Sequence, residues 1–155
     1  MANILNLFKF IKSKRPKYTI PLKLKLINNL PLTKEELNVR GSLNLGSTPI
    51  QSLPDNLNVR GSLNLNNTPI QSLPDNLKVG GNLILNNTPI QSLSDNLKVG
   101  ENLYLSNTPI QSLPNNLTIN GYLDLRNTPI SKKYTKEEIL KMIASTGGSV
   151  KGIYI

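Results

Sequence analysis

The chain has 155 residues, of which 37% are hydrophobic and 17% are charged, with a formal net charge of +9 and neither cysteine nor histidine. The missing residue types exclude disulfides, thiolate nucleophiles, imidazole bases and ordinary zinc sites. A chain of this length is expected to form one domain, residues 1–155, and its thin supply of apolar residues favours repeated units that bury their faces against one another.

The positive charge lies at the ends of the chain. Residues 1–34 hold eight Lys/Arg and no acidic residue (+8), residues 35–130 hold five basic and seven acidic residues (−2), and residues 131–155 hold five and two (+3), which sums to +9. No apolar run is long enough to span a membrane, and the N-terminus lacks the residue order of a secretory signal.

Residues 1–18 form a basic segment in which Ile4, Leu7, Phe8 and Ile11 recur at the spacing of an amphipathic helix that ends at Pro16. Three interpretations stay open. The helix caps the first repeat, docks on a protein partner, or contacts an anionic membrane or nucleic acid. Nucleic acid is the weakest of these, because the chain has few aromatic residues and its repeats are slightly acidic.

Residues 19–36 are expected to form an N-terminal cap. Leu22, Leu24 and Leu26 alternate with Lys23 and Lys25, the pattern of a half-buried strand. We therefore predict that this segment is a degenerate first coil, with lysines that discourage edge-to-edge pairing.

Residues 37–130 are repeats. The tripeptide TPI occurs at 48, 68, 88, 108 and 128, a constant spacing of 20 that predicts a solenoid of about five coils with parallel strands. Leu57, Val59, Leu63 and Leu65 are all odd-numbered, so an extended chain points them to one interior. Between them lies Gly61, for which we predict a corner.

A hairpin turning at Arg60-Gly61 is the rival to this solenoid. It would place Val59 and Leu63 on opposite faces, so the single winding strand is preferred. Glu101 replaces glycine at the equivalent place in a later copy, and a carboxylate there must reach solvent.

Asn, Thr and Pro after Leu65 predict a turn, in which the hydroxyl of Thr68 satisfies bending backbone. Asp55, Asp75 and Asp95 form a column, one in each coil. A bridging cation or an Asx-type turn would both suit them, and the turn is preferred because Asn115 takes the next place. No cofactor, metal site or catalytic group is expected.

The segment LxLxxTxI, carried by Leu63, Leu65, Thr68 and Ile70, resembles the leucine-rich-repeat core, with Thr in place of its Asn. The 20-residue length resembles short repeats of secreted bacterial leucine-rich effectors, and LPxNLxVxGxLxLxNTPI resembles uncharacterised repeat proteins of bacteriophages and large DNA viruses. The leading Leu of the usual pattern is absent, since residue 60 is Arg. The ligase activity of some effectors depends on a Cys that this chain lacks. The resemblance implies a protein of the host-cell cytoplasm or of a virion.

Residues 131–155 are expected to form a C-terminal cap. Thr135 and Glu138 form a capping box, which predicts a helix to about Ala144 that Gly147-Gly148 terminates. Val150, Ile153 and Ile155 then alternate loosely, as in a closing strand. The fold class predicted is thus a β-rich, leucine-rich-repeat-like solenoid with a cap at each end.

Positions at which the copies differ are the candidate binding residues, because the fold does not dictate them. On the outward strand face these are Ile84, Tyr104, Tyr122, Asp124 and Arg126. Tyr and Arg are favoured anchors in protein interfaces, although drift on a hydrated surface would produce the same pattern. A second column, Arg40, Arg60, Lys78 and Lys98, fits solubilising charge better than an anion site.

The function expected is non-enzymatic binding of a host or viral protein through this face. The alternative is a structural virion or assembly component anchored by its N-terminal helix at Ile4, Leu7, Phe8 and Ile11. Either would be a monomer or a weak end-to-end dimer, because each end of a solenoid has strand edges.

Overall fold

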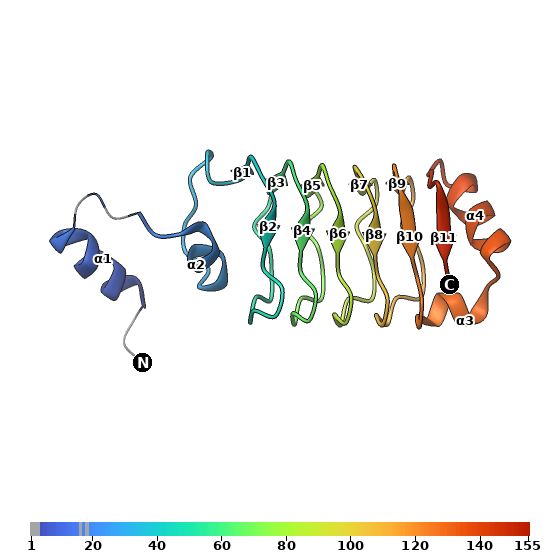
Figure 1. Ribbon diagram of the computed structural model, residues 1–155, viewed down its shortest axis with the longest axis horizontal. Helices are drawn as coiled ribbons and strands as arrows, with labels where there is room; N and C mark the ends of the chain where they lie inside the picture. Colours follow the sequence, from blue (N-terminus) through green and yellow to red (C-terminus); the bar gives the residue numbers. More distant parts are fainter. Residues whose placement is uncertain (1–3, 16, 18) are drawn as a thin grey trace.

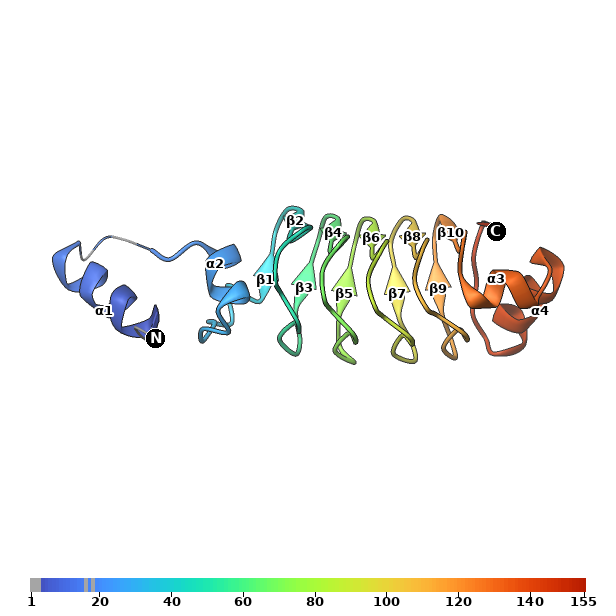
Figure 2. The same ribbon diagram turned by 90° about the horizontal axis from the view of Figure 1, so that it is seen from below.

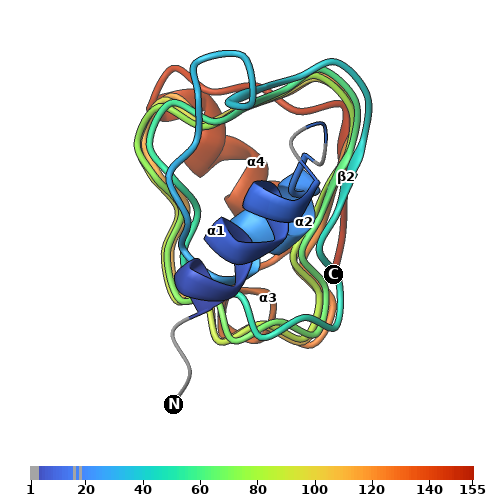
Figure 3. The same cartoon turned by 90° about the vertical axis from the view of Figure 1, so that its left-hand side faces the viewer.

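The computed structural model describes residues 4–15, 17 and 19–155. The repeats stack into an elongated solenoid with helices at both ends (Figure 1). Viewed along the stack, successive coils superimpose on one outline (Figure 3). The predicted parallel-strand solenoid with 20-residue coils is therefore confirmed.

Two parallel sheets run along the solenoid, one on each side of a corner in every coil (Figure 2). Within the described residues, sheet A has five strands of two residues each: β1 (Asn38–Val39), β3 (Asn58–Val59), β5 (Lys78–Val79), β7 (Lys98–Val99) and β9 (Thr118–Ile119). Sheet B has six: β2 (Leu43–Asn44), β4 (Leu63–Asn64), β6 (Leu83–Ile84), β8 (Leu103–Tyr104), β10 (Tyr122–Asp124) and β11 (Gly152–Tyr154).

The register between repeats equals the sequence period. Val59 pairs with Val79, and Leu63 pairs with Leu83, both in parallel. These pairings contradict the hairpin alternative and confirm the corner near Gly61. The corner is sharp enough to divide the expected single strand into two strands that belong to different sheets. At this corner Glu101 is exposed, as expected, and its carboxylate accepts a hydrogen bond of 2.6 Å from the Asn82 amide.

One apolar core runs through all the coils. The inward leucines, valines and isoleucines of the repeats are almost fully buried, apart from the partly buried Val39 and Leu113. The equivalents of Leu63 and Leu65 reach 0% exposure in the later coils. Since each coil packs only on its neighbours, stability is expected to accumulate coil by coil.

The turn after each sheet B strand is held by side chains. The Thr68 hydroxyl donates to the carbonyl of Leu65 at 2.7 Å, and the same bond recurs at Thr48, Thr88, Thr108 and Thr128. Each threonine thus serves its own coil. The preceding asparagines adopt positive φ, as asparagine tolerates. Their amides form a ladder, since Asn127 donates to Asn107 at 3.0 Å and Asn107 donates to Asn87 at 2.8 Å.

At the N-terminal end, the strand predicted over Leu22–Leu26 is wrong. This segment is a helix, α2 (Leu22–Ile27), which begins after Pro21. Leucine and lysine are good helix formers, and the helical spacing aims Leu22 and Leu26 at the same end of the core. Leu26 is buried, whereas Leu24 is 40% exposed. Lys25 also forms an ion pair of 2.6 Å with Glu36, so α2 is tied to the start of the first coil.

The predicted N-terminal helix is present as α1 (Ile4–Lys14). It lies beyond α2 along the solenoid axis (Figures 1 and 2). The core includes Leu26 and, at its margin, Leu22, but none of the described side chains of α1. Packing on the first coil is therefore supplied by α2, and the interpretation of α1 as the cap over that coil is wrong. None of the helices in the described ranges is long and apolar enough to cross a membrane.

The C-terminal end has the predicted helix and closing strand, preceded by a short helix that the sequence did not suggest. This is α3 (Pro129–Lys133), which starts at the last TPI with Thr128 as its N-cap. In α4 (Lys136–Ser145), the predicted capping box joins Thr135 and Glu138. Strand β11 pairs in parallel with β10 and extends sheet B by one coil.

Candidate functional site

The candidate binding residues lie together on the outward face of sheet B, towards its C-terminal end. Register pairing places Ile84 beside Tyr104, and Tyr104 beside Asp124. Tyr122 lies two positions before Asp124 on strand β10, and Arg126 lies two positions after Asp124, just beyond the end of that strand. The structure therefore brings the predicted residues into one surface.

Strand β11 adds a residue that sequence reasoning missed. Tyr154 pairs with Asp124 on the side opposite Tyr104. Its ring lies against that of Tyr122, with the two centroids 5.5 Å apart. The loose alternation of Val150, Ile153 and Ile155 carried the signal for a strand, but its register on β10 depends on α3 and α4. We call Ile84, Tyr104, Tyr122, Asp124, Arg126 and Tyr154 the tyrosine face.

Two of these tyrosines are strongly exposed. Tyr122 is 45% exposed and Tyr154 is 52% exposed, while Ile84 and Tyr104 are half-buried between neighbouring coils. The backbone N–H of Tyr122 donates to the side-chain oxygen of Asn102 at 2.8 Å, which fixes the strand beneath its ring. The surface thus offers aromatic edges on a rigid sheet.

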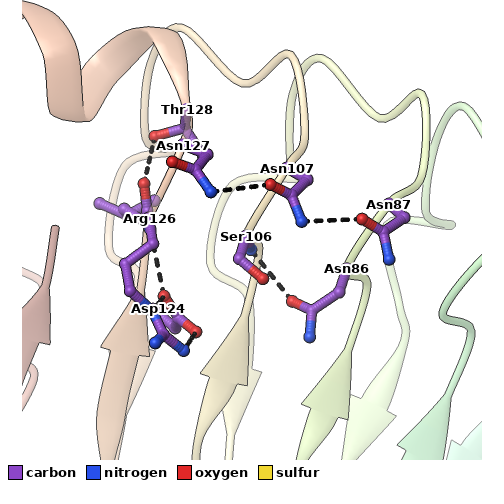
Figure 4. A network of polar contacts seen from close by, with 9 residues as sticks. Asn86, Asn87, Ser106, Asn107, Asp124, Arg126, Asn127 and Thr128 are labelled. Carbon is purple, nitrogen blue, oxygen red and sulfur yellow. Dashed lines mark hydrogen bonds and ion pairs between the residues drawn. The ribbon is translucent and has the colours of Figure 1, made fainter.

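Asp124 is not exposed, contrary to the prediction. Its exposure is 2%, because Tyr104 and Tyr154 flank it on the neighbouring strands and Arg126 covers it. Arg126 donates to both carboxylate oxygens, from Nε at 2.9 Å and from Nη2 at 2.7 Å (Figure 4). The Arg126 side chain as a whole remains 63% exposed. Asp124 therefore acts as the support that orients Arg126 on the tyrosine face.

The pairing also sets the ionisation of both groups. Burial raises the pKa of Asp124, but the hydrogen bonds from Arg126 outweigh this effect, so the pKa of the Asp124 carboxyl lies below its ordinary value. The same hydrogen bonds raise the pKa of Arg126. The tyrosine face accordingly presents a cation whose counter-charge is buried.

The outward column of sheet B shows which residues the fold itself requires. In two early coils, Asn44 and Asn64 each accept a hydrogen bond from the backbone N–H two residues on, at 3.1 and 3.0 Å. Asp124 keeps this bond, to the N–H of Arg126 at 3.1 Å. Ile84 and Tyr104 take the same position without an acceptor group. These two residues therefore replace a side chain that caps a turn in the other coils.

The residues predicted in α1 do not share one environment. Leu7 is 54% exposed, Phe8 is buried and Ile11 is half-buried, while the side chain of Ile4 lies outside the described residues. Phe10 is 60% exposed and was not predicted as a contact. Although Phe8 is buried, it is not part of the solenoid core.

The column of aspartates lies exposed at the corners of successive coils. Asp55, Asp75 and Asp95 are exposed, and Asp95 accepts a hydrogen bond of 2.8 Å from the backbone N–H of Asn115 in the next coil. Asp95 thus links the corners of two adjacent coils. The predicted Asx turn within its own corner is not what its carboxylate forms. Across residues 4–15, 17 and 19–155, no cluster of three metal-ligating side chains is found.

The basic column separates from the tyrosine face. Lys78 and Lys98 pair in register within sheet A and are exposed. Arg40 and Arg60 lie at the corresponding corners, one residue beyond strands β1 and β3. This basic column therefore lies on a different sheet from the aromatic residues.

A comparison with protein-family models found no match, and none was found among curated proteins or among solved structures. The resemblances to leucine-rich repeats, bacterial effector repeats and viral repeat proteins therefore stay predictions from the sequence.

Proposed function

We propose that the chain is a non-enzymatic interaction protein, of phage or viral origin, that binds a host or viral protein through the tyrosine face. The proposed origin rests on the sequence resemblance alone. The binding role rests on the replacement of turn-capping asparagine by Ile84 and Tyr104.

At Ile84 this replacement favours function over drift, because it removes a favourable contact. After Tyr104 the backbone N–H of Ser106 donates instead to the Asn86 side chain at 3.0 Å. A side-chain to backbone hydrogen bond contributes about 0.5–1.5 kcal/mol to stability. Ile84 forgoes that bond, and Tyr104, Tyr122 and Tyr154 extend the apolar surface beside it. Four such residues on neighbouring strands form a continuous patch.

The chemistry of the patch suits a protein partner. Tyrosine and arginine are enriched among residues that dominate binding free energy, and both present a hydrogen-bonding tip with a large contact area. The guanidinium of Arg126 is held in place by Asp124, so it loses little freedom on binding. A partner with an apolar centre and an acidic group beside it would match this surface.

The test is affinity capture from infected and uninfected cells, followed by titration of the purified partner. Tyr104→Ala should weaken that partner's affinity at least tenfold, as expected for a central anchor. The matched control is Asn64→Ala, which changes the same outward column two coils away. Equal affinity for the wild type and Tyr104→Ala, measured with folded proteins, would refute the proposed site.

A structural role anchored by the N-terminal helix is the second candidate, favoured by the position of α1 outside the core. Deletion of residues 1–17 separates the two. If the deletion abolishes association with the partner and Tyr104→Ala does not, the helix rather than the tyrosine face carries the function.

A further inference from the structure

Helix α1 exposes apolar side chains that the solenoid core does not use. Leu7 and Phe10 lie one turn apart on the helix and are 54% and 60% exposed. Lys14 follows Phe10 by four residues, and its ammonium lies 5.9 Å from the centre of the Phe10 ring. One side of α1 therefore combines two large apolar groups with a cation at its border.

The charge around this helix has one sign. Lys9, Lys12 and Lys14 belong to α1, and Arg15 and Lys17 follow it directly. The sequence has no acidic residue before Glu35. Because the repeats carry a net charge of −2, from five basic and seven acidic residues in 35–130, the positive field is concentrated at the N-terminal end.

We propose that α1 docks on the surface of an anionic lipid membrane, with Leu7 and Phe10 inserted between headgroups and its lysines on lipid phosphates. Short helices that combine exposed apolar residues with lysines lie in the membrane interface, and their binding strengthens with anionic lipid. An 11-residue helix is too short to span a bilayer, so α1 lies along the surface.

A membrane accounts for both features of α1 together. Nucleic acid would neutralise the lysines but leave Leu7 and Phe10 in water, because phosphate contacts are electrostatic. An apolar groove on a protein would cover Leu7 and Phe10. Such a groove would not by itself account for the five positively charged residues beside them. Nucleic acid and protein partners are therefore outcomes that the experiment must separate from lipid.

This inference is independent of the proposed protein partner. The tyrosine face lies near the C-terminal end of the solenoid, and α1 lies beyond its N-terminal end (Figure 1). A variant of the tyrosine face, Tyr104→Ala, should leave lipid binding unchanged, so failure of one proposal does not imply failure of the other.

The experiment is flotation of the full chain with vesicles of phosphatidylcholine alone, or with about 30% phosphatidylglycerol, at about 0.15 M salt. Binding is expected only to the anionic vesicles and should fall as salt is raised. Lys12→Gln with Lys14→Gln should weaken binding about 30-fold, since each lysine contributes about fivefold. The matched control is Lys78→Gln with Lys98→Gln, which removes the same charge from sheet A and should leave binding unchanged.

Insertion of α1 into the membrane can be followed by tryptophan fluorescence, because the chain contains no tryptophan of its own. Phe10→Trp places a single indole on α1, and its emission should shift to shorter wavelength with anionic vesicles. Tyr104→Trp should show no shift. Phe10→Ala should weaken vesicle binding about tenfold, as apolar area is lost.

Three results would overturn the proposal. They are equal binding to neutral and anionic vesicles, an unchanged Phe10→Trp emission on bound vesicles, and equal weakening by the two lysine pairs. Binding of the full chain to single-stranded RNA homopolymer without vesicle binding would assign α1 to nucleic acid instead. Loss of the captured protein partner on deletion of residues 1–17, without vesicle binding, would assign α1 to that protein.

Discussion

At the scale of single residues, each coil is fixed by a few polar side chains that bond to backbone. Thr68, Asn67 and their equivalents satisfy the turn, while Asp124 and Arg126 form the one ion pair found within the described solenoid coils. The sequence showed that threonine was repeated, but not that its hydroxyl would donate to its own coil. It also could not reveal that Asp124 would be buried, because the covering Tyr154 belongs to a strand 30 residues away.

Glycine at the corner gives a test of coil spacing. A Cβ added at Gly100 would overlap the carbonyl oxygen of Gly80, whereas one added at Gly41 would have nothing within 4 Å. Gly100→Ala should therefore lower the free energy of unfolding by about 1–3 kcal/mol, as overpacking does. Gly41→Ala should change it by less than about 0.5 kcal/mol. Urea unfolding of both variants checks this, and equal effects would mean that the coils do not approach as closely as described.

The Asp124 carboxylate predicts a dependence on pH. Its pKa is lower in the folded state than in the unfolded chain, so it stabilises the fold above about pH 4 and loses this contribution as pH falls towards its folded pKa. Asp124→Asn should cost about 1 kcal/mol at pH 7, a modest value because the side chain of Arg126 is mostly exposed.

Below about pH 4 the difference between Asp124→Asn and the wild type should shrink. Unfolding midpoints across pH provide the measurement, with Asp55→Asn, at an exposed corner, as the control. A difference that stays constant down to about pH 2 would contradict the role given to the carboxylate.

At the scale of elements, the period of 20 predicted parallel strands paired coil by coil, because each repeat places its leucines at the same odd-numbered positions. It did not predict that the corner divides each strand into two that belong to different sheets. The same reasoning failed for Leu22–Leu26, where alternation over five residues is too short to separate a strand from a helix. The helix is favoured because it covers the end of the core with Leu26. It also allows Lys25 to form its ion pair with Glu36.

Helix α4 is expected to hold the last coil closed. Ile139, which belongs to α4, is fully buried in the solenoid core. The capping box of Thr135 and Glu138 sets where the helix begins. Ile139→Ala should lower the free energy of unfolding by about 2–4 kcal/mol, through lost apolar contact and a cavity. Ile155→Ala is the control, since that residue is 47% exposed. Denaturant titration that found similar small losses for both would show that the cap is not packed on the core.

At the scale of the whole molecule, the solenoid is a rod whose two ends differ. The N-terminal end carries α1 and most of the positive charge, and the C-terminal half carries the tyrosine face. The two proposals together describe a rod attached to a membrane at one end and bound to a protein near the other. Sequence variation between copies located most of the tyrosine face, because positions that depart from the repeat consensus are easily recognised in a regular array. It could not locate Tyr154, which lies outside the repeats.

The shared core and the tyrosine face both depend on successive 20-residue units being stacked side by side in register. Because the chain has no cysteine, engineered pairs can test this without background. Ile84→Cys with Tyr104→Cys places two thiols on register-paired residues of β6 and β8, at the spacing of neighbouring strands, about 4.8 Å, which a disulfide can bridge. Ile84→Cys with Asp124→Cys separates them by a further strand.

The decisive measurement is the yield of intramolecular disulfide in these two double variants after mild oxidation, read by mass spectrometry of the monomer. We predict near-complete bridging between positions 84 and 104 and little between positions 84 and 124. Failure of the first pair to bridge, or equal bridging in both, would contradict the stacking and remove the basis for the tyrosine face.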